Sequence, residues 1–412
     1  MSRFQRVGDS SQQKVTTLEL FYDLVFVFSV TQVSHLLLGH LDWEGAGQAA
    51  LVLLVVWWSW NYTTWVTNEL DPESGVVRLL MVALMLASLL MAVAIPEAFG
   101  DRALLFAGAY VAIQVGRHLF LTFAAAGPGT NERMRASRIL IWFAAAGCFW
   151  IAGALADGAA RTALWLLALL IDYGAPLVTY RVPGLPAVRP EAWNVGVAHF
   201  AERFQLFVII ALGETIVLTG ATTSELDLTT TRIVAFAVAF LTTGAMWWLY
   251  FDYVARIAER RLELARDRTN LARDGYTYLH VVLVAGVIVS AVGDEVAIGH
   301  PGEPLPGAEV AVLVGGPAIY LLGHALFRLR MAGSISWKRL GGALACVAAG
   351  LLGRDLDALV LALLVLAIVV AVIAAEYRSG RRRAARGEPS PLERLEQDAA
   401  GGSAAAHNAR TA

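Results

Sequence analysis

Apolar residues gather in blocks of about twenty along most of the chain, and short polar segments separate these blocks. An α-helix needs about 20 apolar residues to cross the hydrocarbon core of a bilayer. The pattern therefore predicts an all-α fold, a polytopic transmembrane helix bundle of about 12 spans. The expected spans cover residues 18–38, 46–66, 77–97, 102–123, 138–156, 161–180, 200–220, 232–254, 276–298, 309–330, 338–353 and 356–377.

Composition supports a membrane protein and narrows the range of partners. Of the 412 residues, 57% are apolar and 16% are charged, against about 25% charged in average soluble domains. The lipid bilayer is therefore the first partner that the sequence implies. A net charge of −2 gives no electrostatic reason to expect nucleic acid. Nothing in the pattern sets an oligomeric state.

Basic side chains fall mainly on one side of the expected spans. The amino-terminal segment, the loops after even-numbered spans and the carboxy-terminal tail hold 26 of them, whereas the opposite loops hold 4. Arginine and lysine concentrate in the cytoplasmic loops of membrane proteins. We therefore expect a multi-pass protein with both termini in the cytoplasm.

The expected bundle divides into two halves that share short sequence motifs. Six spans per half would make the halves parallel repeats, related by an axis along the membrane normal. The alternative is chance identity, because apolar segments use only a few residue types. The matches are Glu19, Phe21 and Val25 at an offset of 183, Ala49, Leu51, Trp57 and Trp58 at 190, and Gly108, Gly116, Leu119 and Phe120 at 207. The expected parts are a cytoplasmic segment 1–17, a first half 18–181, a cytoplasmic linker 182–198, a second half 199–377 and a disordered cytoplasmic tail 378–412.

Ionisable residues inside spans are the candidates for function, because each costs about 2.5–3.5 kcal/mol at mid-helix on insertion scales. The seventh span carries His199, Glu202, Arg203 and Glu214, which fall within an arc of about 120° at helical periodicity. Such a stripe suits proton or cation relay. The alternative is a structural polar seam that pairs with charges of spans 1 and 4.

The first span places Glu19 and Asp23 one turn apart on one face. Two stacked carboxylates favour the uptake of a proton or a cation. Close to the first turn, they would also interact favourably with the helix dipole, which is the structural alternative.

Spans 4 and 6 add further charges. Arg117 and His118 can share one side of span 4 with Gln114, and we expect Arg117 to neutralise one of the acids. Asp172 lies in span 6 shortly before Pro176, and helix breaks near charges are common at binding sites, although proline also occurs in ordinary spans.

The spacing along span 7 suggests a route for protons. Glu214 lies about 16 Å along the helix from Arg203, which is beyond direct pairing. We therefore expect Glu214 to be a coupling carboxylate, and Asp23 or Glu202 to receive the proton on the cytoplasmic side. Spans 1, 4 and 7 should meet near their cytoplasmic halves.

Motifs of soluble-type catalysis are absent from the sequence, which has no P-loop, no Gly-x-Ser-x-Gly and no His-Glu-x-x-His. His199 and Glu202 stand at helical spacing, but two ligands do not make a closed metal site. We therefore expect no enzyme, no metal and no other cofactor.

Three sequence motifs resemble those of the bacterial low temperature requirement A family. They are residues 18–28 (LELFYDLVFVF), 57–60 (WWSW) and 199–215 (HFAERFQLFVIIALGET), and the likeness extends over about residues 14–377. The resemblance implies a multispanning protein of the cell (inner or plasma) membrane of a bacterium, connected with growth in the cold. It brings no catalytic residues to carry over.

We expect a secondary transporter or a proton/ion-coupled permease for a small solute or ion that the sequence does not name. The alternative is a non-transporting membrane factor that binds lipid or a partner to maintain the envelope in the cold. A third class, an intramembrane enzyme acting on lipid, has no motif behind it.

Overall fold

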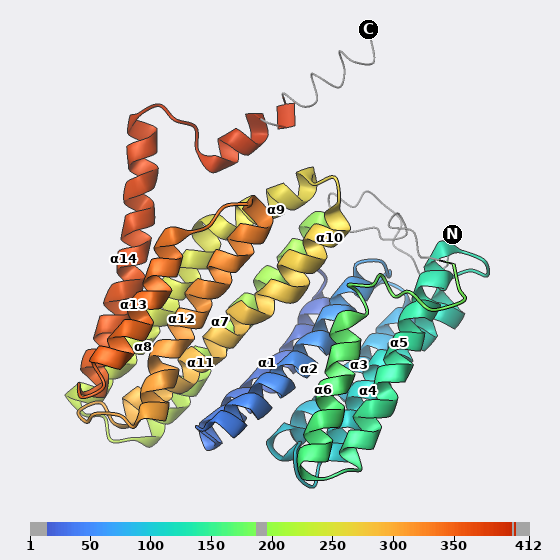
Figure 1. The fold of residues 1–412 in the computed structure, drawn as a ribbon, viewed down its shortest axis with the longest axis horizontal. Helices are drawn as coiled ribbons and strands as arrows, with labels where there is room; N and C mark the ends of the chain where they lie inside the picture. The colour runs from blue at the N-terminus through green and yellow to red at the C-terminus, as the bar shows by residue number, and fades with distance from the viewer. Residues whose placement is uncertain (1–14, 187–195, 398, 401–412) are drawn as a thin grey trace. The chain divides into compact units, whose positions relative to one another are not determined.

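The computed structural model describes residues 15–186, 196–397 and 399–400. Over these residues the chain is built from α-helices and contains no β-strand (Figure 1). Hydrocarbon offers no hydrogen-bond partners, so a spanning segment satisfies its backbone within a helix. The helices are α1 (Thr17–Gly39), α2 (Trp43–Thr67), α3 (Gly75–Ala94), α4 (Ala103–Phe120), α5 (Asn131–Ala154), α6 (Gly158–Gly174), α7 (Val197–Glu225), α8 (Thr230–Leu249), α9 (Ala255–Leu264), α10 (Arg268–Ala272), α11 (His280–Gly299), α12 (Gly307–Ala332), α13 (Trp337–Leu352) and α14 (Ala358–Ala385).

Each of the twelve expected spans coincides with a helix. Within the described ranges, nine helical stretches are both long and apolar enough to cross a bilayer. The helices α2, α6 and α13 also form where spans were expected, but they do not meet both conditions. α6 and α13 have 17 and 16 residues, and the second half of α2 is rich in tryptophan and threonine. The protein is a polytopic, all-α integral membrane protein.

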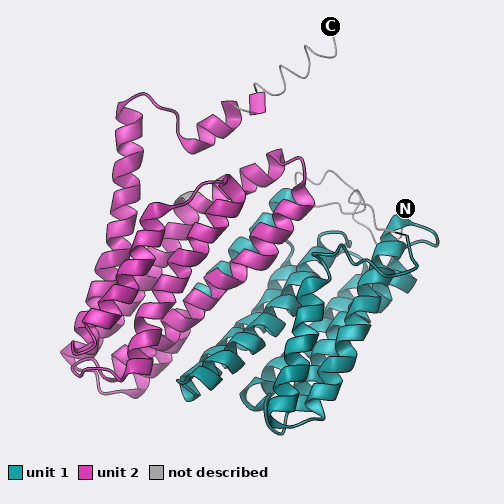
Figure 2. Cartoon of the chain, viewed as in Figure 1, with its two compact units in different colours: residues 1–214 teal, residues 215–412 magenta. Residues whose placement is uncertain are grey.

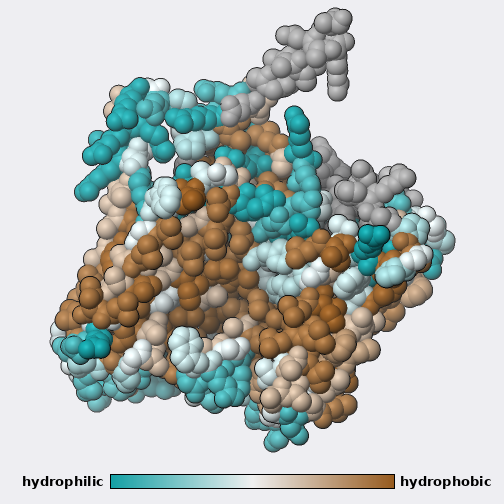
Figure 3. Space-filling model, viewed as in Figure 1, coloured by the Kyte–Doolittle hydropathy of each residue, from teal (hydrophilic) through white to brown (hydrophobic). Residues whose placement is uncertain are grey.

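The outer faces of the helices carry aliphatic side chains rather than charges. On α3, Leu79, Val82 and Leu86 are each more than half exposed, and their spacing places them on one face. Figure 3 shows hydrophobic side chains over the middle of the helices in each unit and hydrophilic ones near the helix ends. A soluble bundle would cover such a face with polar residues, so this face is suited to contact lipid.

The chain forms two compact units, residues 1–214 and residues 215–412 (Figure 2). In unit 1, α1 packs against α2 and α3, and the chain then continues through the successive pairs α3–α4, α4–α5 and α5–α6. α6 returns to α2. The boundary falls inside α7, so residues 197–214 of this helix belong to unit 1.

Unit 2 packs its helices in a similar order, through the pairs α11–α12, α12–α13, α13–α14 and α14–α8. The α11–α12 pair is the tightest because glycines let the two backbones approach. A Cβ atom on Gly316 would lie 2.3 Å from the backbone nitrogen of Ser290, and one on Gly286 would lie 2.5 Å from that of Tyr320. Small residues at such crossings are typical of membrane helices.

Helix caps explain where the helix ends differ from the expected spans. α5 begins at Asn131 rather than at 138, because the Thr130 side chain accepts a hydrogen bond from the Arg133 backbone and caps the helix. α14 continues to Ala385 rather than ending at 377. Gly387, at φ +66°, closes it with the paired backbone bonds of a Schellman motif.

The expected disordered tail, 378–412, begins with helical structure. After α14, residues 391–397 form a further helical stretch, which Ser390 caps through the Glu393 backbone. Arg260 of α9 holds Glu396 with two hydrogen bonds of 2.7 and 2.8 Å. Residues 1–14, 187–195, 398 and 401–412, which include parts of the expected amino-terminal segment, linker and tail, lie outside the described residues.

Candidate functional site

The start of α1 places two acids inside unit 1. Thr16 caps the helix, and the Glu19 carboxylate accepts hydrogen bonds of 2.9 Å from the Thr16 backbone and 2.8 Å from its hydroxyl. Asp23 follows one turn later on the same face. Both side chains are buried, Glu19 to 1% exposure and Asp23 completely. The structural alternative for Glu19, a favourable helix start, is thus realised, but the same carboxylate also contacts another helix.

α7 brings the opposite charges to these acids. His199 Nε2 lies 3.0 Å from a carboxylate oxygen of Glu19, and its Nδ1 lies 3.3 Å from the Asn68 side chain. Arg203 donates a 2.6 Å hydrogen bond to Asp23 and lies 3.5 Å from Glu19. The expected meeting of spans 1 and 7 is therefore present. We call Glu19, Asp23, Trp60, His199 and Arg203 the charged network.

α2 supplies the polar groups that complete the charged network. Trp60 Nε1 donates a 2.8 Å hydrogen bond to the Asp23 carboxylate, and Arg203 donates to the Thr67 hydroxyl at 3.4 Å. None of the ionisable candidates predicted from the sequence lies on this helix, although the motif of residues 57–60 includes Trp60. The signal of this helix was a polar run, residues 59–68, in which serine, asparagine and threonine recur within an otherwise apolar block.

Arg117 of α4 does not pair with an acid in the described part of the chain, so the expectation that it neutralises one is wrong. Its guanidinium donates to the Thr63 hydroxyl at 2.8 Å, to the Ser59 carbonyl at 3.4 Å and to the Gln114 side chain. Tyr22 of α1 donates to the same Thr63 hydroxyl at 2.8 Å. Neutral acceptors thus surround this fully buried cation, and α2 links α4 to α1.

Gln114 continues the hydrogen bonds from Arg117 toward Asp172. Its amide nitrogen donates to the Tyr110 hydroxyl at 3.1 Å, and Tyr110 donates to the Asp172 carboxylate at 2.8 Å. Trp150 Nε1 donates to the same oxygen at 2.9 Å. Asp172 is 2% exposed and has no cationic partner among the described residues. A buried chain of polar groups therefore connects an arginine to a carboxyl group through two neutral side chains.

The helix break expected near Pro176 is the end of α6, which stops at Gly174, two residues before the proline. The next residues turn sharply, and Thr179 and Tyr180 both have φ near +52°. Residues other than glycine rarely adopt this backbone conformation. Here it accompanies a hydrogen bond between the buried hydroxyls of Tyr180 and Tyr62.

The two remaining acids of α7 lie apart from the charged network. Glu214 is 1% exposed and accepts a 2.7 Å hydrogen bond from the Thr31 hydroxyl of α1. Glu202 is half-buried and accepts a hydrogen bond of 3.2 Å from the Val15 backbone. The stripe expected along α7 is therefore divided, because Glu202 faces the amino-terminal segment instead of Arg203.

His118 of α4 is buried beside the rings of Tyr62 and Phe143, with ring centroids 6.0 and 5.0 Å away. Its Nδ1 lies 2.9 Å from the Gln114 backbone carbonyl. A cavity of unit 1 lies beside His118 among α2, α4 and α5. Its lining contains no residue of α1 or α7.

Buried acids and buried arginines are similar in number in the described part of unit 1. The acids are Glu19, Asp23, Asp172 and Glu214, and the arginines are Arg117, Arg135, Arg138, Arg161 and Arg203. Asp172 and Arg117 are each buried without an ion-pair partner among the described residues, because their hydrogen bonds go to neutral groups.

Unit 2 buries a different set of polar groups. The Tyr250 hydroxyl lies 2.9 Å from His280 Nε2, and the Tyr276 ring stacks on His280 with centroids 4.8 Å apart. The His324 ring packs between Tyr250 and Tyr320 at 5.9 and 4.6 Å. These five residues, the ring cluster, carry neither an acid nor an arginine.

Comparison with known proteins agrees with the family resemblance of the three sequence motifs. The family model described as "Bacterial low temperature requirement A protein (LtrA)" matches residues 14–374. A protein of Rhizobium meliloti (strain 1021), described as uncharacterized, is 40% identical over 320 residues, which are 77% of this chain and 78% of that protein. No solved structure matches the chain. The chain belongs to the bacterial low temperature requirement A family.

Proposed function

We propose that the protein is a proton- or cation-coupled secondary transporter, and not an enzyme. The observation that carries the proposal is a buried acid of unit 1, Asp172, which has no cationic partner among the described residues. A buried carboxylate without a compensating charge is costly, and the cost is relieved by a bound proton or cation. Ionisable residues at such positions in membrane helices mark ion pathways and proton relays.

Glu214 is the group best suited to coupling. Asp23 accepts hydrogen bonds from Arg203 and Trp60, so protonation of this carboxylate would weaken its 2.6 Å ion pair with Arg203. Glu214 accepts a hydrogen bond from the neutral Thr31 hydroxyl, which can accompany either the charged or the protonated carboxyl. Glu202, half-buried near the other end of this part of α7, is placed to receive a proton from water. In this proposal the charged network is the fixed framework between them.

Reconstituted vesicles that contain a pH-sensitive dye test the proposal. Inward gradients of Na⁺, K⁺ and small solutes should drive a change of internal pH with the natural protein. Glu214→Gln should abolish this change while it preserves expression and folding. The matched control is Glu44→Gln, an exposed position at the start of α2. Full activity of Glu214→Gln would contradict the proposal.

We further propose that the protein lies in the bacterial cell membrane with both termini in the cytoplasm, which the 26 to 4 distribution of basic residues supports. Single cysteines in loops 39–45 and 299–308 should then react with an impermeant reagent from outside. Cysteines in 124–137 and 255–275 should be protected. The reverse pattern would overturn the orientation.

An internal repeat is part of the same proposal. Two observations support it: α6 returns to α2 in unit 1 as α14 returns to α8 in unit 2, and the offset of 207 pairs Arg117 with His324, which are both buried polar residues. An experimental structure in lipid should relate spans 1–6 to spans 7–12 by a rotation of about 180° around the membrane normal. A relation that inverts one half would contradict the repeat.

The second candidate is a non-transporting factor that binds lipid or a partner to maintain the envelope in the cold. The observation that favours it is the complete burial of the Arg203–Asp23 pair, as expected of a structural seam. Water access decides between the two. A cysteine at position 31, beside Glu214, should react with a small water-soluble reagent in a transporter and stay unreactive in a sealed seam.

A further inference from the structure

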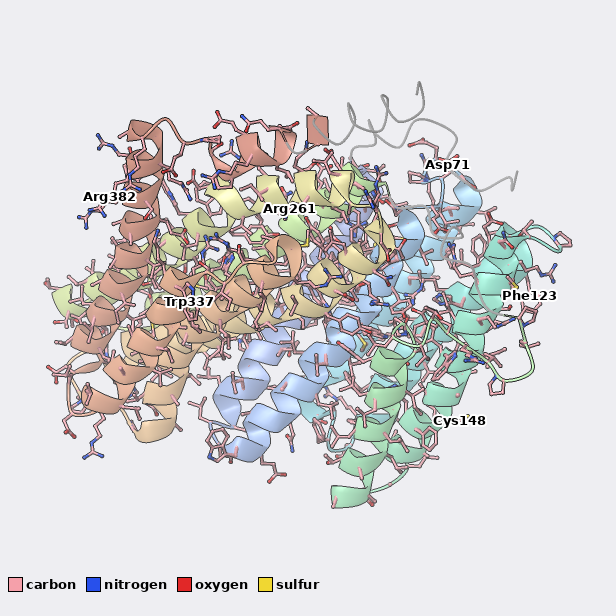
Figure 4. The ribbon with its side chains drawn as sticks, turned by 45° about the horizontal axis from the view of Figure 1, so that its top comes forward. Asp71, Phe123, Cys148, Arg261, Trp337 and Arg382 are labelled. Carbon is pink, nitrogen blue, oxygen red and sulfur yellow. The ribbon has the colours of Figure 1, made fainter. Side chains whose placement is uncertain are left out.

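The cavity of unit 1 lies where α2 ends and α5 begins. Figure 4 labels Asp71, in the loop that follows α2, and Phe123, in the turn that follows α4. The space open to the centre of a water molecule is about 40 Å³, and one water needs about 10–15 Å³. The cavity therefore has room for a molecule of a few heavy atoms. Its polar and aromatic lining comes from Tyr62, Trp65, Glu69, His118, Glu132 and Arg135.

One wall of the cavity is an irregular turn. Residues Leu121–Ala125 leave the α-helical pattern, and the Ala126 backbone N–H donates to the Leu121 carbonyl five residues earlier. Leu121 and Ala125 both line the cavity. Such wide turns within helices occur frequently at functional sites.

The side chains that line the cavity carry more negative than positive charge, and an arginine outside the lining, Arg117, lies over the Tyr62 ring at 5.6 Å from its centroid. Arg135 forms an ion pair with Glu69, so these two charges cancel. Glu132 is half-buried and has no ion-pair partner in the described part of the chain. Burial raises the pKa of the Glu69 carboxyl above its ordinary value, although Arg135 opposes this effect and the charge of Glu132 adds to it. The lining would thus be stabilised by one more cation.

His118 offers the cavity a hydrogen-bond acceptor. The side chain is 1% exposed, and its Nδ1 is bound to the Gln114 carbonyl. An Nδ1 that faces a carbonyl carries the hydrogen, so Nε2 of the neutral ring is left as an acceptor. Nε2 has no hydrogen-bond partner among the described residues. A ligand that satisfies this nitrogen must donate an N–H or an O–H.

We propose that this cavity binds a small protonated amine, of the size of methylammonium. The N–H groups of the amine would donate to His118 Nε2 and to the Glu132 carboxylate. Its positive charge would balance the Glu132 carboxylate and interact with the face of Trp65, since the Arg117 guanidinium already lies over the Tyr62 ring. The same carboxylates would repel a small anion. Equilibrium binding of the amine requires no proton movement, so this inference goes beyond the proposed coupling.

Isothermal titration calorimetry on the full chain in lipid nanodiscs tests the site, with methylammonium as the probe and acetate as the anion of similar size. Methylammonium should bind saturably, and acetate should not. Glu132→Gln and His118→Phe should each weaken binding at least tenfold. In His118→Phe, the phenylalanine ring keeps the packing against Tyr62 and Phe143. Glu132→Gln changes only a half-buried side chain, so it still tests the site if His118→Phe misfolds.

The control is Glu73→Gln, an exposed acid in the same loop, which should bind as the natural protein does. Absence of saturable methylammonium binding, equal binding of acetate, or unchanged affinity in Glu132→Gln would each overturn the site. Glu214→Gln should bind methylammonium normally. Loss of flux with intact binding would therefore refute the proposed function alone, and loss of binding with intact flux would refute this site alone.

Discussion

Unit 1 buries the ion pairs of the charged network between α1, α2 and α7, whereas unit 2 buries the rings of tyrosine and histidine between α8, α11 and α12. Unit 2 also buries Asp294 of α11 and Arg339 of α13, which lie outside the ring cluster. In unit 1, Arg203 must satisfy Asp23 and Glu19 at once, and the positions of three helices are thereby fixed to one another. In unit 2, His324 has no hydrogen-bond partner for either ring nitrogen among the described residues. A neutral ring tolerates this far better than an ion would.

The two units also differ in how their helices approach. Gly323 of α12 faces the α11 backbone, with a Cβ position 3.2 Å from the Leu283 nitrogen, whereas its matched residue Gly116 of α4 has nothing within 4 Å. Unit 2 therefore gains cohesion from close backbone packing. Unit 1 gains specificity from its buried ion pairs.

The largest effect that we predict is from removal of the arginine of the charged network. Arg203→Leu leaves Asp23 and Glu19 buried without this partner, which costs about 3–5 kcal/mol. Thermal unfolding of the purified protein in detergent measures the change. Arg102→Leu, at an exposed pair with Glu97, should cost less than about 1 kcal/mol. Equal costs for the two variants would remove the distinction between a buried network and surface charge.

Close packing in unit 2 gives the next effect. Gly316→Ala places a Cβ against the Ser290 backbone and should cost about 1–3 kcal/mol in the same assay. The neighbouring Gly315 has nothing within 4 Å of its Cβ position, so Gly315→Ala should be neutral or stabilising by up to about 1 kcal/mol. If both substitutions are tolerated, backbone approach does not hold unit 2 together.

Replacement of one buried histidine in each unit compares the two units directly. His199→Phe removes partners of Glu19 and Asn68 and should cost about 1–3 kcal/mol, because buried groups lose their hydrogen bonds. His324→Phe replaces one unbonded ring by another and should cost less than about 1 kcal/mol. A larger loss for His324→Phe would show that the ring cluster has a hydrogen-bonding role.

The smallest expected effect is at Asp172. Asp172→Asn keeps an oxygen for the Tyr110 hydroxyl and the Trp150 N–H, so stability should change by less than about 1 kcal/mol. Asp172→Ala removes that acceptor and should cost about 1–3 kcal/mol. A large loss for the asparagine variant would mean that the charge of Asp172 is itself required.

Much of the fold could be predicted from the sequence, because a span that crosses hydrocarbon must be helical and about twenty residues long. All twelve blocks became helices for this reason. The helix ends could not be placed as well, since caps such as Thr130 and the Gly387 turn extend α5 and α14 into polar sequence. Hydropathy also understates α2, whose tryptophan and threonine side chains are buried inside the unit.

The candidate site was predicted in part. Opposite charges in a membrane must find each other, and this principle was enough to join Glu19, Asp23 and Arg203. It gave the wrong partner for Arg117, because a sequence shows that a cation needs acceptors but not whether an acid, a carbonyl or a hydroxyl provides them. The Trp57–Trp58 pair is buried while the matched Trp247–Trp248 pair is half-exposed, a difference that identical words cannot reveal.

The central claim is that unit 1 holds a proton or cation on a buried acid, and infrared difference spectroscopy tests it most directly. A protonated carboxylic acid has a C=O stretching band that an ionised carboxylate lacks. In vesicles at neutral pH and without added metal cations, the natural protein and Glu44→Gln should both show this band, and Glu214→Gln should lose it. A spectrum of the natural protein without the band, or a band that is unchanged in Glu214→Gln, would contradict the assignment of the proton to Glu214.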